Sequence, residues 1–221
     1  VSVIGPSGAG RSPLLRTIAG AGGPYSGAVR FDGAEMKDYD LERLAQRLGY
    51  LPKETGLFSG TVKENIARFT PYLGEDLGEI DEKVIAAAKM CGVHDMILRL
   101  QDGYDTMLGL GGKGLSAGQA QGVALARALY GEPRLLLLDE PNAHLDSEGE
   151  VRLLETLRQQ KAMGGAALSG AHRTGILAAV DRLMVMREGR IELYGPRDEV
   201  LARLAAPNVT PHPTPANRAA S

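Results

Sequence analysis

The chain has 221 residues, and 25 Lys+Arg against 27 Asp+Glu give it a formal net charge of −2. A chain of this length forms one compact domain, or one domain with a smaller insert, and excludes a multi-domain machine. The near-neutral balance excludes a global positive field for nucleic acid or an anionic bilayer, and the sequence shows no local basic patch, so we expect no nucleic-acid partner. Cys91 is the one cysteine, which rules out an internal disulfide and is typical of a reducing compartment.

Short apolar or β-prone runs alternate with helical patterns along the chain. In chain order, we expect a strand over 1–4, a helix over 13–19, a strand over 29–31, a helix over 40–47, a strand over 48–51, helices over 81–91 and 117–130, a strand over 135–138, a helix over 147–161, strands over 166–169, 183–186 and 191–194, and a helix over 198–204. This alternation predicts a wound α/β sheet that is parallel at its centre. The apolar run 135–138 has no polar alternation, which predicts a central strand covered on both faces. It is far shorter than the ~20 residues that span a bilayer.

The signal for strands disappears between residues 53 and 129, which predicts a helical insert in the sheet domain. We therefore assign residues 1–52 and 130–206 to the core and residues 53–129 to a helical subdomain. Residues 207–221 are rich in Pro, Ala and Asn and predict a disordered tail. The sequence opens directly on an interior strand, so we expect a truncated N-terminus.

A glycine-rich loop, GPSGAGRS at residues 5–12, follows the first strand and opens the first helix. Its glycines allow successive N–H groups to turn inward, and the helix N-terminus adds positive partial charge, so the segment predicts a phosphate cradle. The pattern for such loops is G-x-x-x-x-G-K-[ST], and Arg11 stands where the lysine belongs. An ordinary glycine-rich turn is the alternative interpretation of this segment alone.

The apolar strand at 135–138 ends in two carboxylates, Asp139 and Glu140, which is the form of a Walker B element. Such a strand would bring Asp139 beside the Ser12 hydroxyl, where both could hold Mg²⁺, and leave Glu140 to orient or deprotonate a water. Paired acids after an apolar run can also simply begin a solvated loop. The two elements together, in order and each after a strand, favour a nucleotide site.

The segment LSAGQ at residues 115–119 precedes the helix expected over 117–130. Ser116 with Gln119 three places later forms a capping-box pattern that any helix could use. The same hydroxyl and free N–H groups could also hold a phosphate. The chemistry of these residues leaves the two interpretations even, and the position of the segment in the chain decides between them.

The ordered motifs GPSGAGRS, LSAGQ, LLLLDEP, NAHLD and AHR together resemble the nucleotide-binding domain of an ABC transporter. Within that family, LGYLPKETGLFSGTVKENIARF, LQDGYDT, ALARALYGEPRLLLLDEPN and YGPRDEVLARL are most similar to the ATPase half of type I secretion exporters, and the likeness covers about residues 1–205. The resemblance implies a P-loop NTPase fold: a RecA-like, mostly parallel sheet with an inserted α-helical subdomain, the family's N-terminal strands being absent.

The resemblance also implies the cofactors ATP and Mg²⁺ and a role for each motif. Phosphate binding falls to Gly5, Pro6, Ser7, Gly8, Ala9, Gly10, Arg11 and Ser12. Ser12 and Asp139 would hold the metal, Glu140 would be the hydrolytic base, and His172 would touch the γ-phosphate. Ser116, Gly118 and Gln119 would complete the site of a second copy in a head-to-tail dimer, with Asp146 at the interface.

Two further expectations follow from the resemblance. One is a transmembrane exporter domain, fused or on a separate chain, that would place this chain at the cytoplasmic face of the inner membrane. The other is type I secretion-like export of a polypeptide, driven by hydrolysis of Mg-ATP.

Several residues depart from the family pattern in loops that would face the ligand, and three of them bear on hydrolysis. Arg11 replaces a compact ammonium by a bulkier planar cation, and Pro13 removes one backbone N–H near the phosphates. Lys53 stands at the Q-loop position, where the family has a glutamine, and should repel Mg²⁺ or replace part of its role. We therefore expect nucleotide binding to persist and hydrolysis to be depressed. A degenerate domain that binds nucleotide, dimerises or regulates with little hydrolysis is the alternative; a soluble ABC ATPase of nucleic-acid maintenance is disfavoured because basic patches and coiled-coil heptads are absent.

Overall fold

A six-stranded sheet forms the centre of the computed structural model, which describes residues 1–22, 26–70, 76–170 and 174–205. The strands lie in the order β10-β9-β1-β8-β7-β4. Their bounds are β1 Ser2–Ile4, β4 Leu48–Leu51, β7 Leu135–Asp139, β8 Ala166–Gly170, β9 Arg182–Arg187 and β10 Arg190–Pro196. All neighbouring pairs are parallel except β9 and β10, which are antiparallel. The predicted wound α/β sheet with a parallel centre is thus confirmed.

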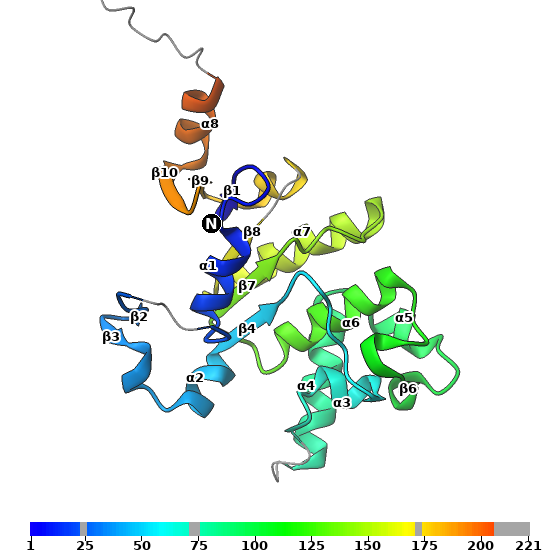
Figure 1. The fold of residues 1–221 in the computed structure, drawn as a ribbon. Coiled ribbons are helices and arrows are strands. Elements are labelled where there is room, and N and C mark those ends of the chain that lie inside the picture. Colours follow the sequence, from blue (N-terminus) through cyan, green and yellow to red (C-terminus); the bar gives the residue numbers. More distant parts are fainter. Residues whose placement is uncertain (23–25, 71–75, 171–173, 206–221) are drawn as a thin grey trace, which may run out of the picture.

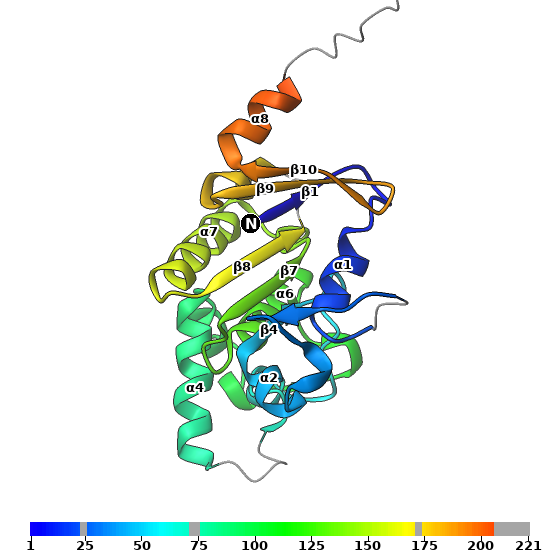
Figure 2. The ribbon, with the colours of Figure 1, turned by 90° about the vertical axis from the view of Figure 1, so that its left-hand side faces the viewer.

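Helices cover both faces of this sheet. Their bounds are α1 Arg11–Ile18, α2 Leu41–Arg47, α3 Val62–Ile66, α4 Leu77–Met90, α5 His94–Leu98, α6 Ala117–Leu129, α7 Ser147–Ala162 and α8 Arg197–Ala205. Short 3₁₀ helices occupy Met36–Asp38, Gly103–Asp105, Leu110–Gly112 and Thr174–Ala179. Figure 1 shows α1 on one face of the sheet and α6 and α7 on the other, with α3, α4 and α5 gathered beside α6. In Figure 2, β9, β10 and α8 lie at one end of the molecule and α2 and α4 at the other.

Burial explains why β7 is an interior strand. Leu136, Leu137 and Leu138 are 0% exposed, as expected for a strand with apolar side chains on both faces. The core cluster continues from β7 into α6 and α4, so the helical segment and the sheet share one apolar interior. Gly49 on β4 lets the end of α6 approach closely, because a Cβ there would lie 2.1 Å from the carbonyl oxygen of Ala128.

Side-chain caps set where several helices begin. Asp40 accepts hydrogen bonds from the backbone N–H groups of Glu42 and Arg43 at the start of α2. Asp76 caps α4 in the same way, so this helix begins at Leu77, four residues before the predicted start at residue 81. The sequence-based expectation for α4 overlooked this cap.

The expectation that residues 53–129 contain no strands is wrong. β5 (Gly60–Thr61) and β6 (Met107–Leu108) form a two-stranded antiparallel ladder there, and α3 and α5 were also missed. A second small ladder joins β2 (Arg30–Phe31) to β3 (Ala34–Glu35). β2 falls within the strand expected over 29–31, while the missed elements span two to five residues, too short for a periodic pattern. The predicted tail over 207–221 lies outside the described residues.

Candidate functional site

The glycine-rich loop connects β1 directly to α1. Gly10 is the N-cap residue of α1, with a left-handed φ of 98°, and no side chain caps the helix. An N-cap without a side chain leaves the start of α1 open to an anion, as in anion sites at helix N-termini. Pro13 lies in the first turn, where its missing N–H costs no helical hydrogen bond, so the helix tolerates it.

The end of β9 and the turn that follows it hold this loop in place. A Cβ at Gly5 would lie 2.1 Å from the carbonyl oxygen of Met186, so only glycine fits at this position. The backbone N–H of Gly189 donates to the carbonyl oxygen of Ala9 at 3.1 Å. Segments from opposite ends of the described chain thus fix the shape of the loop.

Arg11 turns back across its own loop. Its residue is only 6% exposed, and Nη1 donates to the carbonyl oxygens of Gly5 and Pro6, the latter at 3.2 Å. The guanidinium therefore satisfies two backbone carbonyl oxygens of its own loop. A phosphate bound here would meet a cation that is already engaged with the backbone of the loop.

Asp139 and Glu140 lie at the carboxyl end of β7, beside the loop. Asp139 is 2% exposed, and its buried Oδ1 has no hydrogen-bond partner within the described residues. A Cβ on Gly170 would lie 3.5 Å from that oxygen and 3.6 Å from Cβ of Arg11. Gly170 therefore lies between the two motifs and close to both. The structure thus brings the two predicted motifs together across Gly170.

The unpartnered carboxylate oxygen fits a divalent cation. A buried carboxylate carries a large desolvation cost unless a cation or a donor compensates it. Mg²⁺ typically takes one or two protein carboxylates and completes its coordination with phosphate oxygens and water. In the described part of the chain, no group of three or more His, Cys, Asp or Glu side chains could hold a metal without such help.

Tyr50 on β4 lies near the same carboxylate, and Arg16 on α1 forms a hydrogen bond with Tyr50. Burial raises the pKa of Tyr50 and the charge of Asp139 raises it further, while a hydrogen bond from Arg16 acts in the opposite direction. Sequence motifs did not indicate Tyr50 or Arg16. The position of Tyr50 depends on the pairing of β4 with β7, which places it opposite Leu137.

Lys53, at the predicted Q-loop position, lies against Glu140. Its Nζ is 3.2 Å from Glu140 Oε1, and the exposed fractions of the two side chains are 58% and 17%. Glu140 has a left-handed φ of 50°, and its backbone N–H donates to the carbonyl oxygen of Gly170 at 2.8 Å. An ammonium group therefore neutralises the carboxylate that we predicted to act on water.

The LSAGQ segment forms a complete capping box at the start of α6. Ser116 Oγ accepts from the N–H of Gln119 at 3.3 Å, and Gln119 Oε1 accepts from the N–H of Ser116 at 2.9 Å. Asp146 caps α7 by accepting from the N–H of Gly149 at 2.7 Å. One surface cavity of about 470 Å³ is lined by Ser116, Gly118, Gln119 and Asp146. The residues predicted to face a second copy therefore lie together, and His172 lies outside the described residues.

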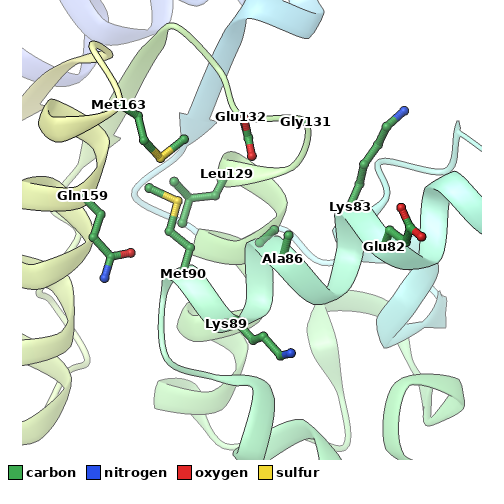
Figure 3. Close-up of a pocket in the computed structure, with 11 residues that line it drawn as sticks. Glu82, Lys83, Ala86, Lys89, Met90, Leu129, Gly131, Glu132, Gln159 and Met163 are labelled. Atoms are coloured by element: carbon green, nitrogen blue, oxygen red, sulfur yellow. The ribbon is translucent and has the colours of Figure 1, made fainter.

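A larger cavity of about 670 Å³ lies elsewhere, between α4, the end of α6 and α7 (Figure 3). Met90 and Met163 point toward Leu129 in this cavity, and most of its lining is apolar. None of the residues predicted for the nucleotide site lines it. Size alone therefore does not locate the chemistry of this chain.

Comparison with known proteins identifies the family. The family model described as ABC transporter matches residues 1–143. The chain belongs to the ABC transporter family. The type I secretion system ATP-binding protein PrsD of Rhizobium meliloti (strain 1021) is 48% identical over 207 residues, which cover 94% of this chain and 34% of that protein. The cyclolysin secretion/processing ATP-binding protein CyaB of Bordetella pertussis (strain Tohama I) is 37% identical over 202 residues, covering 91% of this chain and 27% of CyaB.

A solved structure of a bacterial Atm1-family ABC exporter with ATP bound matches this ABC domain with a TM-score of 0.79 at 35% identity. The match covers 91% of this chain and 34% of the exporter chain. This ABC domain thus spans between about a quarter and a third of the length of these relatives. The predicted P-loop NTPase fold is confirmed, and the chain is an exporter-type ATP-binding domain related to type I secretion ATPases. Within the described ranges, every helix is too short or too polar to traverse a bilayer.

Proposed function

We propose that this ABC domain binds Mg-ATP at the loop of residues 5–12 and hydrolyses it to drive polypeptide export. The observation that carries the proposal is the buried Asp139 Oδ1, which has no partner within the described residues and lies beside the glycine-rich loop. A buried carboxylate in this position is suited to a cation that also binds phosphate. The relationship to exporter ATPases supports the same reaction.

In this proposal each motif acts on one part of the nucleotide. The loop amides and Arg11 bind the phosphates, and Ser12 and Asp139 would hold Mg²⁺, which neutralises developing charge on the phosphate oxygens. Glu140 accepts a proton from the attacking water, or orients it, and His172 contacts the γ-phosphate. Arg11 is engaged with loop carbonyls, and Lys53 is engaged with Glu140. The engagement of Arg11 opposes turnover, and the pair of Lys53 with Glu140 must open before Glu140 can act, so we expect slow hydrolysis.

A second copy would complete the site. Ser116, Gly118 and Gln119 would approach the phosphates bound by the other copy, with Asp146 at the interface between them. Their shared location at one cavity supports this arrangement. The names of the relatives support a membrane partner: PrsD and CyaB are secretion ATP-binding proteins, and the matched structure is an exporter. We propose that a transmembrane domain, fused or separate, holds this domain at the cytoplasmic face of the inner membrane.

Steady-state phosphate release from Mg-ATP, together with titration of a slowly hydrolysed ATP analogue, tests the proposed reaction. We expect saturable analogue binding, and phosphate release that the Glu140→Gln variant loses. If the unmodified chain binds the analogue but releases no phosphate from ATP, the alternative function is correct: a degenerate domain that binds nucleotide without hydrolysing it. Absence of binding would contradict both functions.

The mass of Glu140→Gln in ATP, measured by light scattering, tests the head-to-tail dimer. We expect a dimer that Ser116→Arg abolishes. Thr61→Arg is the matched control, because Thr61 and Glu64 form the same capping box at the start of α3, away from the proposed interface. Loss of either cap costs about 1 kcal/mol, so a difference between the two variants reports the interface. Equal dimerisation of both variants would exclude Ser116 from the interface.

A further inference from the structure

The pairing of Lys53 with Glu140 follows from the register of two neighbouring strands. β4 and β7 are parallel, and Leu51 is paired with Leu138. Lys53 and Glu140 each follow their paired residue by two positions, so both side chains leave the sheet at the same carboxyl edge. The 3.2 Å contact between Nζ and Oε1 therefore rests on the sheet itself.

The two partners differ in freedom. Glu140 is held by its backbone hydrogen bond to Gly170, and its side chain is 17% exposed. Lys53 has a side chain 58% exposed, on a stem of four carbons that can move its ammonium by several ångströms. Ion pairs of this exposure are weak and salt-sensitive, so a more highly charged competitor displaces them readily.

We propose that Lys53 is a recognition residue for the terminal phosphate of a nucleoside triphosphate. In the nucleotide-free domain its ammonium holds Glu140, and in the loaded domain it binds the terminal phosphate and releases Glu140. This inference rests on the proposed nucleotide site at residues 5–12. The exchange would let the domain discriminate a triphosphate from a diphosphate. Only the triphosphate carries the terminal phosphate that draws Lys53 away from Glu140.

The exchange predicts coupling between two substitutions. Removing the carboxylate in Glu140→Gln frees Lys53, so we expect tighter binding of a slowly hydrolysed ATP analogue, by roughly three- to fivefold, and no comparable change for ADP. Lys53→Gln should weaken analogue binding by about tenfold and leave ADP binding unchanged. In the double variant the gain from Glu140→Gln should disappear, because no ammonium remains to be freed. Lys53→Arg should retain most of the preference for the analogue.

Equilibrium titration of the four proteins of this cycle with the analogue and with ADP, at constant Mg²⁺ and salt, is the experiment. Lys37→Gln is the matched control, since Lys37 forms an exposed 2.8 Å ion pair with Glu35 outside the site. Analogue binding in which the two substitutions act additively, or a Lys53→Gln variant that binds like Lys37→Gln, would overturn the exchange while leaving the nucleotide site intact. Failure of the unmodified chain to bind either nucleotide would instead show that the proposed function itself is wrong, and the exchange with it.

Discussion

The guanidinium of Arg127 donates a 2.7 Å hydrogen bond to the backbone carbonyl oxygen of Thr55. A second bond, of 3.0 Å, reaches the carbonyl oxygen of Gly56. Arg127 belongs to α6, the helix that LSAGQ opens, and the two carbonyls follow Lys53 by two and three residues. The side chain of Arg127 thus connects α6 to the loop that carries Lys53.

Replacing this side chain should destabilise the domain. Arg127→Met keeps the length of the side chain but removes its donors, so the two carbonyls lose their partners. We expect the free energy of unfolding to fall by about 2 kcal/mol, measured by denaturant titration. Arg158→Met is the control, because Arg158 is exposed and pairs with Glu155 of the same helix. Equal effects of the two substitutions would show that the bonds to the loop contribute nothing.

A methyl group at Gly5 should disrupt the phosphate loop. Its Cβ would lie 2.1 Å from the carbonyl oxygen of Met186, so β9 must shift, and we expect Gly5→Ala to lower the free energy of unfolding by about 2 kcal/mol or more. At Gly8 a Cβ would have nothing within 4 Å, and only the positive φ of 78° is unfavourable. Gly8→Ala should therefore cost about 1 kcal/mol. Denaturation midpoints of the two variants check this order, and the reverse order would contradict the observed packing.

Restoring a lysine at position 11 should raise turnover. Arg11→Lys replaces a planar cation bonded to loop carbonyls with a compact ammonium suited to phosphate oxygens, and we expect phosphate release to rise by about tenfold or more. Arg30→Lys, in a surface pair with Glu35, serves as the control. Unchanged turnover in Arg11→Lys would remove Arg11 as the cause of slow hydrolysis.

Burial of Cys91 predicts a thiol that is inert in the folded domain and a loss of stability at alkaline pH. Burial raises the pKa of this thiol from 9.0 to about 12. Because the folded pKa exceeds the unfolded one, the contribution is complete below about pH 9 and is lost as the pH rises toward about 12. At pH 10 the loss should be about 1 kcal/mol.

Denaturation midpoints between pH 8 and pH 11 test this dependence. Cys91→Ala should show a shallower decline than the unmodified chain, whatever its stability at pH 8. A thiol reagent at pH 8 should label Cys91 only when denaturant is present. Parallel declines in the two proteins would assign the alkaline loss to other groups.

Much of the sheet could be predicted because its signals are local. The apolar run of β7, the alternation of strands and helices, and the glycine-rich turn before α1 all lie within short windows of sequence. The starts of α3 and α4 depend on the caps Thr61 and Asp76, whose signals were present but overlooked. The ladder between β5 and β6 joins segments that are distant in the chain, so no window contains its pattern. The hairpin of β2 and β3 is local: β2 lies within the strand expected over 29–31, and the pairing with β3 across Asp32-Gly33 was overlooked.

In the candidate site, too, the local motifs could be predicted from the sequence and the contacts between distant segments could not. The loop at 5–12 and the acids after β7 were found as motifs, and the structure places them on either side of Gly170. The return of Arg11 to its own loop and the contact of Lys53 with Glu140 could not be predicted from the motifs. Both depend on which backbone groups and strand ends are neighbours in space, and for the second the register of β4 against β7 decides it.

The position of β1 bears on how this domain is made. β1 lies between β8 and β9 and pairs with both, so the first strand of the chain completes its hydrogen bonding only with strands near the other end. A ribosome that adds residues at roughly 5–20 per second leaves this first segment waiting on the order of ten seconds or longer. During that interval the nascent chain carries the glycine-rich sequence without the backbone of Met186 and Gly189 to shape it. Nucleotide can therefore stabilise the newly made domain only after the chain has been made as far as Gly189, and not while the helical segments of residues 62–129 are emerging.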